Sequence, residues 1–144
     1  MVQNRNKLIE LFIGNISNAL VHEILEMAVS KELVADKYRK ELASSFEIAN
    51  RYREKINPVN RSLPDKDVVY IKDKIVARAK SELMIRISKG YLNIDLELVK
   101  LLTDKALKDV KIIWDIENYD ILSMIAFWFN LCFYILSELY KLGR

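Results

Sequence analysis

The residues best suited to chemistry lie close together near the N-terminus. The chain has a single histidine, His22, which is followed by Glu23 and, one helical turn later, by Glu26. A histidine with two carboxylates at this spacing can bind a metal ion or act as a base. The usual zinc and di-iron sites need further histidine or cysteine ligands, which this sequence does not supply. We therefore interpret His22 as a solvated side chain and predict neither a metal site nor a cofactor.

Other catalytic signatures are also missing from the sequence. It contains one cysteine, Cys132, which lies in an apolar stretch and is expected to be a buried, unreactive thiol. No glycine-rich loop that could cradle a phosphate is present. The sequence therefore predicts a protein that is not an enzyme.

Positive charge is concentrated in the middle of the chain. Residues 51–90 contain eleven Lys or Arg and five Asp or Glu, although the net charge of the whole chain is only +3. A basic surface beside tyrosines can hold a nucleic-acid backbone and stack a base. The alternative is a solvated helical surface whose cations pair with acids along the same helix. The residues predicted to contact DNA or RNA are Arg51, Arg53, Lys55, Arg61, Lys74, Arg78 and Lys89.

The C-terminal part is the most apolar stretch, with no charged residue in residues 121–137. A transmembrane helix needs roughly 20 apolar residues and places its tryptophans near the edges, whereas Trp128 lies in the middle of this run. We expect the stretch to be buried in the core of the protein itself. Two alternatives are an interface with another protein chain or a second copy, and a membrane anchor over residues 121–142. Aromatic side chains are typical interface anchors, and the predicted interface residues are Phe127, Trp128, Phe133, Tyr134 and Tyr140.

The elements that position these residues are expected to be helices. Three Gly and two Pro in 144 residues leave few turn-forming residues, and the apolar fraction of 51% is that of a globular protein. Apolar residues at three- and four-residue spacing predict five helices, at residues 4–29, 31–56, 65–89, from 93 or 95 to 114, and 121–142. The segment 57–64 contains both prolines and separates the second helix from the third, which ends at Gly90.

We predict an all-α fold with a single domain over residues 1–144, a five-helix bundle packed around the hydrophobic C-terminal helix. Two cations, Lys72 and Arg86, fall on the apolar stripe of the third helix. They either extend their charged ends to water or meet carboxylates of a neighbouring helix or a partner.

The first functional hypothesis is a non-enzymatic accessory or interaction subunit of an intracellular complex, associated with nucleic acid through the basic region. The N-terminal residues lack the features of a secretory signal, so we expect a cytoplasmic protein. The alternative is a structural protein–protein module or homodimer that makes no contact with nucleic acid. A further alternative is a protein tethered to a membrane by residues 121–142.

Overall fold

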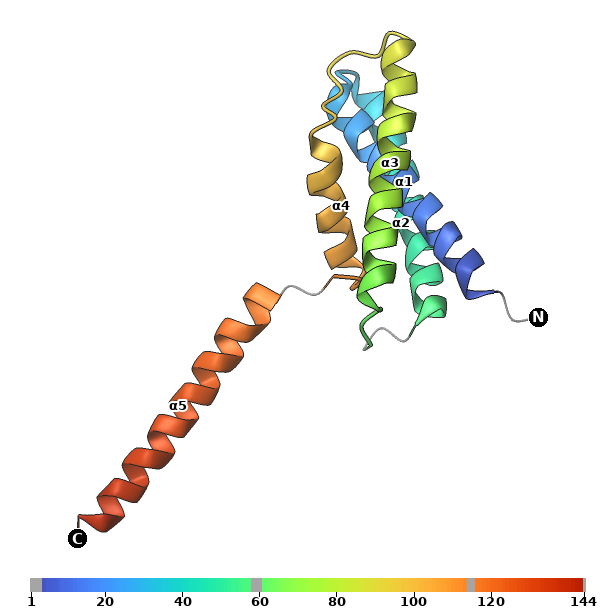
Figure 1. Ribbon diagram of the computed structural model, residues 1–144. Helices are drawn as coiled ribbons and strands as arrows, with labels where there is room; N and C mark the ends of the chain where they lie inside the picture. The colour runs from blue at the N-terminus through green and yellow to red at the C-terminus, as the bar shows by residue number, and fades with distance from the viewer. Residues whose placement is uncertain (1–3, 58–60, 114–115, 144) are drawn as a thin grey trace. The chain divides into compact units, whose positions relative to one another are not determined.

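The structure, a computed structural model, describes residues 4–57, 61–113 and 116–143, without the side chains of residues 116–124. The described residues form five α-helices and no strand, which confirms the all-α prediction. The chain divides into two units, Met1–Ile113 and Trp114–Arg144, and each is described by itself (Figure 1).

Three helices begin and end close to their expected limits, and two depart from them. The first unit contains α1 (Arg5–Ala28), α2 (Glu32–Ile56), α3 (Asp65–Ser88) and α4 (Leu98–Asp109), and the second contains α5 (Ile116–Leu142). α4 is shorter than predicted at both ends, and α5 begins five residues before its predicted start at residue 121. Asp95 does not cap α4 but accepts a hydrogen bond from the backbone N–H of Glu97, at 3.0 Å, in the turn before the helix.

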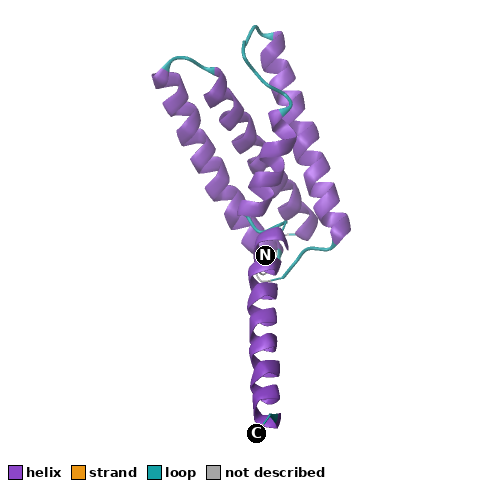
Figure 2. Cartoon of the chain, turned by 90° about the vertical axis from the view of Figure 1, so that its left-hand side faces the viewer, coloured by secondary structure: helices purple, strands orange, loops and turns teal. Residues whose placement is uncertain are grey.

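The core of the first unit is built around α1. This helix contacts α2, α3 and α4, and the helices lie side by side in Figure 2. Its apolar residues cover a wide arc rather than one stripe, because Ile9, Ile13 and Leu25 are buried as well as Phe12 and Ile16. The central position that the sequence analysis assigned to residues 121–142 is therefore occupied by α1 in this unit.

A charged pair links α3 to α4 beside the core. Lys72, which lies on the apolar side of α3, places its Nζ 2.7 Å from Oδ1 of Asp104 on α4. The hypothesis that this lysine meets a carboxylate of a neighbouring helix is confirmed. The other cation of the stripe, Arg86, lies over the ring of Tyr91, with 5.7 Å between the guanidinium carbon and the ring centre.

Both α3 and α4 end in the same hydrogen-bonded motif, in which one residue adopts the left-handed conformation. That residue is Gly90 (φ 93°) after α3 and Lys111 (φ 58°) after α4. The bonds that define the motif run from backbone N–H groups to carbonyls: Tyr91 to Arg86 at 3.1 Å, Gly90 to Ile87 at 3.0 Å, Ile112 to Leu107 at 2.9 Å and Lys111 to Lys108 at 3.0 Å. A side chain is disfavoured in this conformation, so the motif suits Gly90 and is strained at Lys111.

Candidate interaction sites

The most prominent surface is the apolar surface of α5. Every apolar side chain between residues 125 and 142 is exposed. The predicted interface residues are all part of this surface, with exposed fractions of 67% for Phe127, 59% for Trp128, 78% for Phe133, 64% for Tyr134 and 69% for Tyr140.

The area of this surface is large for a single protein chain. An aromatic side chain offers about 200 Å², so these five residues and Phe129 together expose roughly 800 Å². The largest apolar patch on a typical monomer is about 300–600 Å². A standard protein interface takes about 800 Å² from each partner. The aromatic residues of α5 alone therefore provide enough surface for one side of a stable interface.

Cys132 lies on α5 and is exposed, which corrects the expectation of a buried thiol. Cys132 is exposed because α5 exposes apolar side chains on all of its sides over the described residues. At the C-terminal end, Lys141 pairs with Glu138 at 3.1 Å, so these two charges compensate each other.

Two helices of the described chain are long and apolar enough to cross a membrane, namely α1 and the part of α5 over Ile125–Leu142. The same test is passed by core helices of soluble proteins, and most of the apolar part of α1 is buried. Length and composition therefore do not separate a lipid environment from a protein environment for α5.

Arg53 is not available to a phosphate group, which corrects its place in the predicted nucleic-acid site. Its side chain is 1% exposed, and its two terminal nitrogens donate to the backbone carbonyls of Asn57 at 2.8 Å and Lys111 at 3.0 Å. Burial lowers the pKa of its guanidinium. Arg53 thus connects the end of α2 to the segment that follows α4, and its role is structural.

The other basic residues near the end of α2 have local partners. Arg51 pairs with Glu47 one turn earlier, at 2.6 Å. The ammonium group of Lys55 lies 5.8 Å from the ring centre of Tyr52. Both side chains are exposed, as is Arg61 in the connection to α3. These contacts are those of a solvated helical surface, the alternative that the sequence left open for this region.

The cations of α3 are arranged differently. Lys66, Tyr70, Lys74 and Arg78 are all exposed and follow one another at four-residue spacing, and we call them the basic row. A helix rises 1.5 Å per residue, so the row extends over about 18 Å. Its three cations make no ion pair within the part of the chain that the structure describes. Lys89 is exposed near the other end of α3 and lies outside the row.

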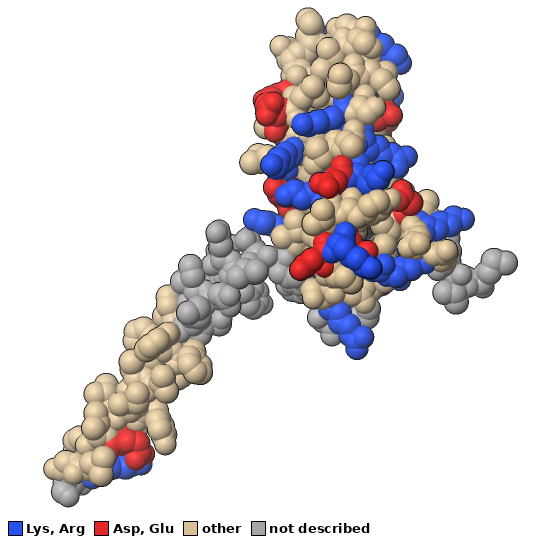
Figure 3. Space-filling view, viewed as in Figure 1, with Lys and Arg blue, Asp and Glu red and all other residues tan. Residues whose placement is uncertain are grey.

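Two contacts orient the basic row. The ammonium of Lys74 lies 5.7 Å from the ring centre of Tyr70, whose hydroxyl donates to the carboxylate of Glu10 on α1. The guanidinium of Arg78 lies beside Gly14 of α1, where an added methyl group would be 3.5 Å from its Nη1. Figure 3 shows basic side chains over this face of the first unit with acidic side chains between them. The row is therefore a narrow feature within a surface of mixed charge.

His22 is paired with a carboxylate that the sequence analysis did not consider. Its Nε2 lies 3.1 Å from Oε2 of Glu41 on α2, and its ring stacks on Tyr38 with 6.0 Å between ring centres. Burial lowers the pKa of His22, and Arg86 lowers it further, against the opposing effect of Glu41. These surroundings therefore favour the neutral form of the imidazole. It lies between helices and is only partly exposed, so the expectation of a solvated histidine is corrected.

The carboxylates next to His22 in the sequence have other partners. Glu26 accepts a hydrogen bond from Nε of Arg39 at 2.9 Å, and burial raises the pKa of Glu23 despite the opposing effect of Lys105. No group of three or more possible metal ligands occurs among the described residues. Nδ1 of His22 is buried and has no hydrogen-bond partner among these residues. His22 does not line the groove described below, whereas Glu23 and Arg39 do.

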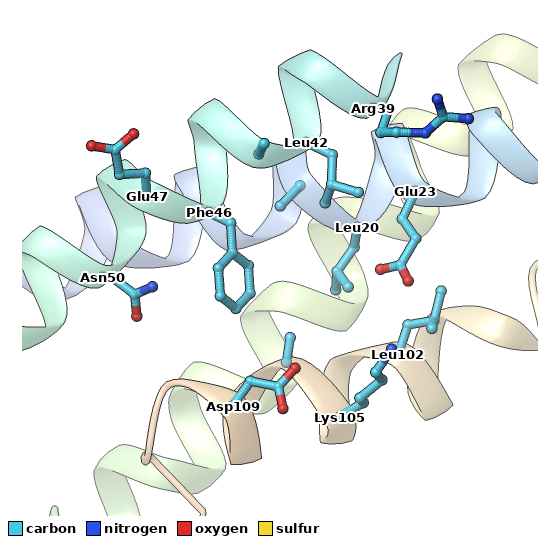
Figure 4. A pocket seen from close by; sticks show the side chains of 13 residues that line it. Leu20, Glu23, Arg39, Leu42, Phe46, Glu47, Asn50, Leu102, Lys105 and Asp109 are labelled. Carbon is cyan, nitrogen blue, oxygen red and sulfur yellow. The ribbon is translucent and has the colours of Figure 1, made fainter. Parts of the chain in front are cut away.

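A groove of about 550 Å³ lies over α1 between α2 and α4 (Figure 4). Its apolar lining includes Leu20, Leu42, Phe46 and Leu102. Charged side chains of both signs surround this lining, and they are Glu23, Arg39, Glu47, Lys105 and Asp109.

No protein-family model, curated relative or solved structure matches this chain.

Proposed function

We propose that this protein is a non-enzymatic helical accessory subunit that joins another protein chain through α5. The observation that supports this proposal is the exposed apolar surface of α5 over residues 125–142. Exposing such a surface to water costs about 25 cal/mol of free energy for each Å². Covering even half of the roughly 800 Å² of aromatic surface would contribute about 10 kcal/mol before the entropic cost of association. This is enough to support a stable complex.

Polar residues within α5 favour a protein partner over lipid. Asn130 lies in the middle of the apolar run, and burying an amide without a hydrogen-bond partner costs about 2–7 kcal/mol in a hydrocarbon environment. Glu138 and Lys141 shorten the uncharged part of the helix at its C-terminal end. At a protein interface, by contrast, these polar groups can remain in contact with water. The helix is therefore better suited to an interface than to the interior of a bilayer.

The proposal is tested by purifying the full chain without detergent and measuring its complexes by light scattering. The double variant Phe129→Ser, Phe133→Ser removes two of the most exposed aromatics of α5. Leu33→Ser is the matched control, because Leu33 is 88% exposed on α2. We expect the wild type and the control to form a complex of fixed stoichiometry, either alone or with a chain from the native host, and the double variant to lose it. A wild type that stays a free monomer in both settings would contradict the proposal.

A second candidate function, nucleic-acid association, is favoured by the basic row on α3. Lys74 and Arg78 lie one helical turn apart and Lys66 lies two turns before Lys74, so the three cations can contact phosphates along one strand, and Tyr70 offers a ring that is 42% exposed for stacking. The remaining predicted contacts, Arg51, Lys55, Arg61 and Lys89, would add only general electrostatic attraction. We therefore infer that any contact with DNA or RNA is centred on Lys74 and Arg78.

Binding of single-stranded and double-stranded oligonucleotides tests this second candidate. The variant Lys74→Glu, Arg78→Glu should weaken binding at least tenfold and reduce its dependence on salt. The variant Lys37→Glu, Lys100→Glu makes the same change in net charge at exposed positions of α2 and α4. If both variants weaken binding equally, the attraction is non-specific and the row is not a binding site.

A further inference from the structure

The apolar residues of α5 follow a seven-residue repeat. In the repeat of a coiled coil, two of every seven positions, a and d, face the partner helix. With Cys132 at position a, these positions hold only apolar residues through the described side chains. They form a surface that we call the heptad face, which consists of Ile125, Trp128, Cys132, Ile135, Leu139 and Leu142. All six are exposed.

The polar residues of α5 fall on the opposite side in the same register. Asn130 and Ser137 both occupy position f, which points away from the partner in a coiled coil. The hydroxyl of Ser137 donates to the carbonyl of Tyr134 at 2.7 Å, so this residue is satisfied within its own helix. A helix surrounded by lipid would have no reason to align its polar residues in this way. Positions b and c on this side also hold exposed aromatic residues such as Phe133 and Tyr134, so position f forms a narrow polar stripe that fixes the register of the heptad.

The positions beside the heptad face indicate which partner it binds. In coiled coils, charged residues at positions e and g select a partner. Here positions e and g hold Phe129, Leu131 and Leu136, with Glu138 as the single charged residue among the described side chains. Glu138 is already paired with Lys141. The surface thus carries no charge pattern that would select a different chain, and its apolar complement is the same face of another α5.

We propose that α5 binds α5 of a second copy of this chain through the heptad face. This inference rests on the proposed function and specifies the partner. The apolar residues at positions e and g widen the contact beyond the heptad face. The eight apolar side chains other than Cys132 at positions a, d, e and g are 39–81% exposed and together offer roughly 800 Å² on each copy, which is the area that a standard two-partner interface needs.

The test compares lysine at positions that differ only in the direction in which they face. Leu139→Lys and Ile125→Lys each place a charge on the heptad face, and Asn130→Lys places the same charge at position f. The full chain of each variant is studied by sedimentation velocity over a range of concentrations without detergent. Circular dichroism verifies that the first unit, whose core forms among α1 to α4, remains folded.

We expect the wild type and Asn130→Lys to self-associate with similar dissociation constants. Leu139→Lys and Ile125→Lys should raise the dissociation constant at least tenfold. Three results would overturn the inference: a wild type that is monomeric at all concentrations, equal loss of association in Asn130→Lys and Leu139→Lys, or a wild type that sediments only with vesicles of phosphatidylcholine. A monomeric wild type that still captures a different chain through Phe129 and Phe133 would leave the proposed function intact and refute only self-association.

Discussion

Arg51 and Arg53 lie two residues apart on α2, and the structure predicts opposite outcomes for the same substitution. Arg53 is buried and its terminal nitrogens donate two hydrogen bonds to backbone carbonyls, whereas Arg51 is exposed and pairs only with Glu47. Replacing each with methionine keeps most of the aliphatic part of the side chain and removes the guanidinium. The pair therefore isolates the contribution of the buried charge and its hydrogen bonds.

The expected loss for Arg53→Met is worked from these contacts. Each hydrogen bond from a charged donor contributes about 1.5–3 kcal/mol, so the two bonds contribute about 3–6 kcal/mol. Nε of Arg53 is buried and has no hydrogen-bond partner among the described residues, which destabilises the fold. Removing this group therefore adds about 1–3 kcal/mol to the free energy of unfolding. Taking the middle of each range, the free energy of unfolding should therefore fall by about 2.5 kcal/mol. For Arg51→Met, an exposed pair within one helix, the loss should be about 0.3–0.5 kcal/mol.

Urea denaturation of the full-length variants, followed by helical circular dichroism, measures both values. For a chain of this size, the loss in Arg53→Met corresponds to a decrease in Tm of about 5–10 °C. Oligonucleotide binding by Arg53→Met, measured below its transition, should equal that of the wild type, since a buried guanidinium cannot reach a phosphate. The reasoning is refuted if the two variants lose the same stability, or if Arg53→Met loses binding while it remains folded.

Three further predictions concern helix ends, pH and thiol reactivity. Lys111→Gly should raise the free energy of unfolding by about 1 kcal/mol, because glycine adopts the left-handed conformation without strain. Gly90→Ala should lower it by about 1–2 kcal/mol, because a side chain is disfavoured there. Effects of the same sign in thermal unfolding of the two variants would contradict this. Because burial lowers the folded-state pKa of His22, the unfolded chain binds more protons below the ordinary value of about 6.5. The contribution of His22 to the free energy of unfolding should therefore be fully present above that pH and decrease as the pH falls further. Urea titrations at several pH values should show a weaker pH dependence of this free energy for His22→Gln than for the wild type. An unchanged pH dependence would exclude the histidine as its source. Cys132 should react with iodoacetamide more slowly in the associated wild type than in Leu139→Lys, and equal rates would place the thiol outside the interface.

Much of the fold could be predicted from residue spacing. The three- and four-residue periodicity gave the limits of α1, α2 and α3 to within about one residue, and Gly90 marked the end of α3 because its conformation favours glycine. The start of α4 was missed because Asn93 and Asp95 resemble helix caps. In the structure they lie in the turn before the helix, where Asn93 has a φ of 63°.

The place of α1 at the centre of the first unit could have been read from the sequence. Ile9, Ile13, Val21 and Leu25 lie beside its main apolar stripe and widen it to a surface that several helices can cover. The uncharged run of residues 121–137 is more conspicuous by composition, and the prediction therefore gave the central position to residues 121–142, whereas α1 occupies it within the first unit. Apolar composition shows that a helix needs covering, but it does not show what covers it.

The candidate sites were less predictable, because they depend on contacts between helices. The pairing of His22 with Glu41 requires the register between α1 and α2, which no local pattern specifies. Arg53 lies four residues after the buried Ala49, so its position was consistent with burial, but its charge suggested the surface. The basic row, in contrast, is visible in the sequence as cations at four-residue spacing along one predicted helix.

The central position of α1 also has a consequence for the order in which the chain folds. Among the helices of the first unit, α1 contacts α2 most extensively, and these two are neighbours in the sequence. Contacts between neighbouring segments form early because little chain entropy is lost in closing them. During synthesis on the ribosome, the hairpin of α1 and α2 can therefore close while the sides of α1 that later meet α3 and α4 are still open. At this stage the nascent chain exposes apolar surface of α1 that α3 and α4 cover only after they have been synthesised.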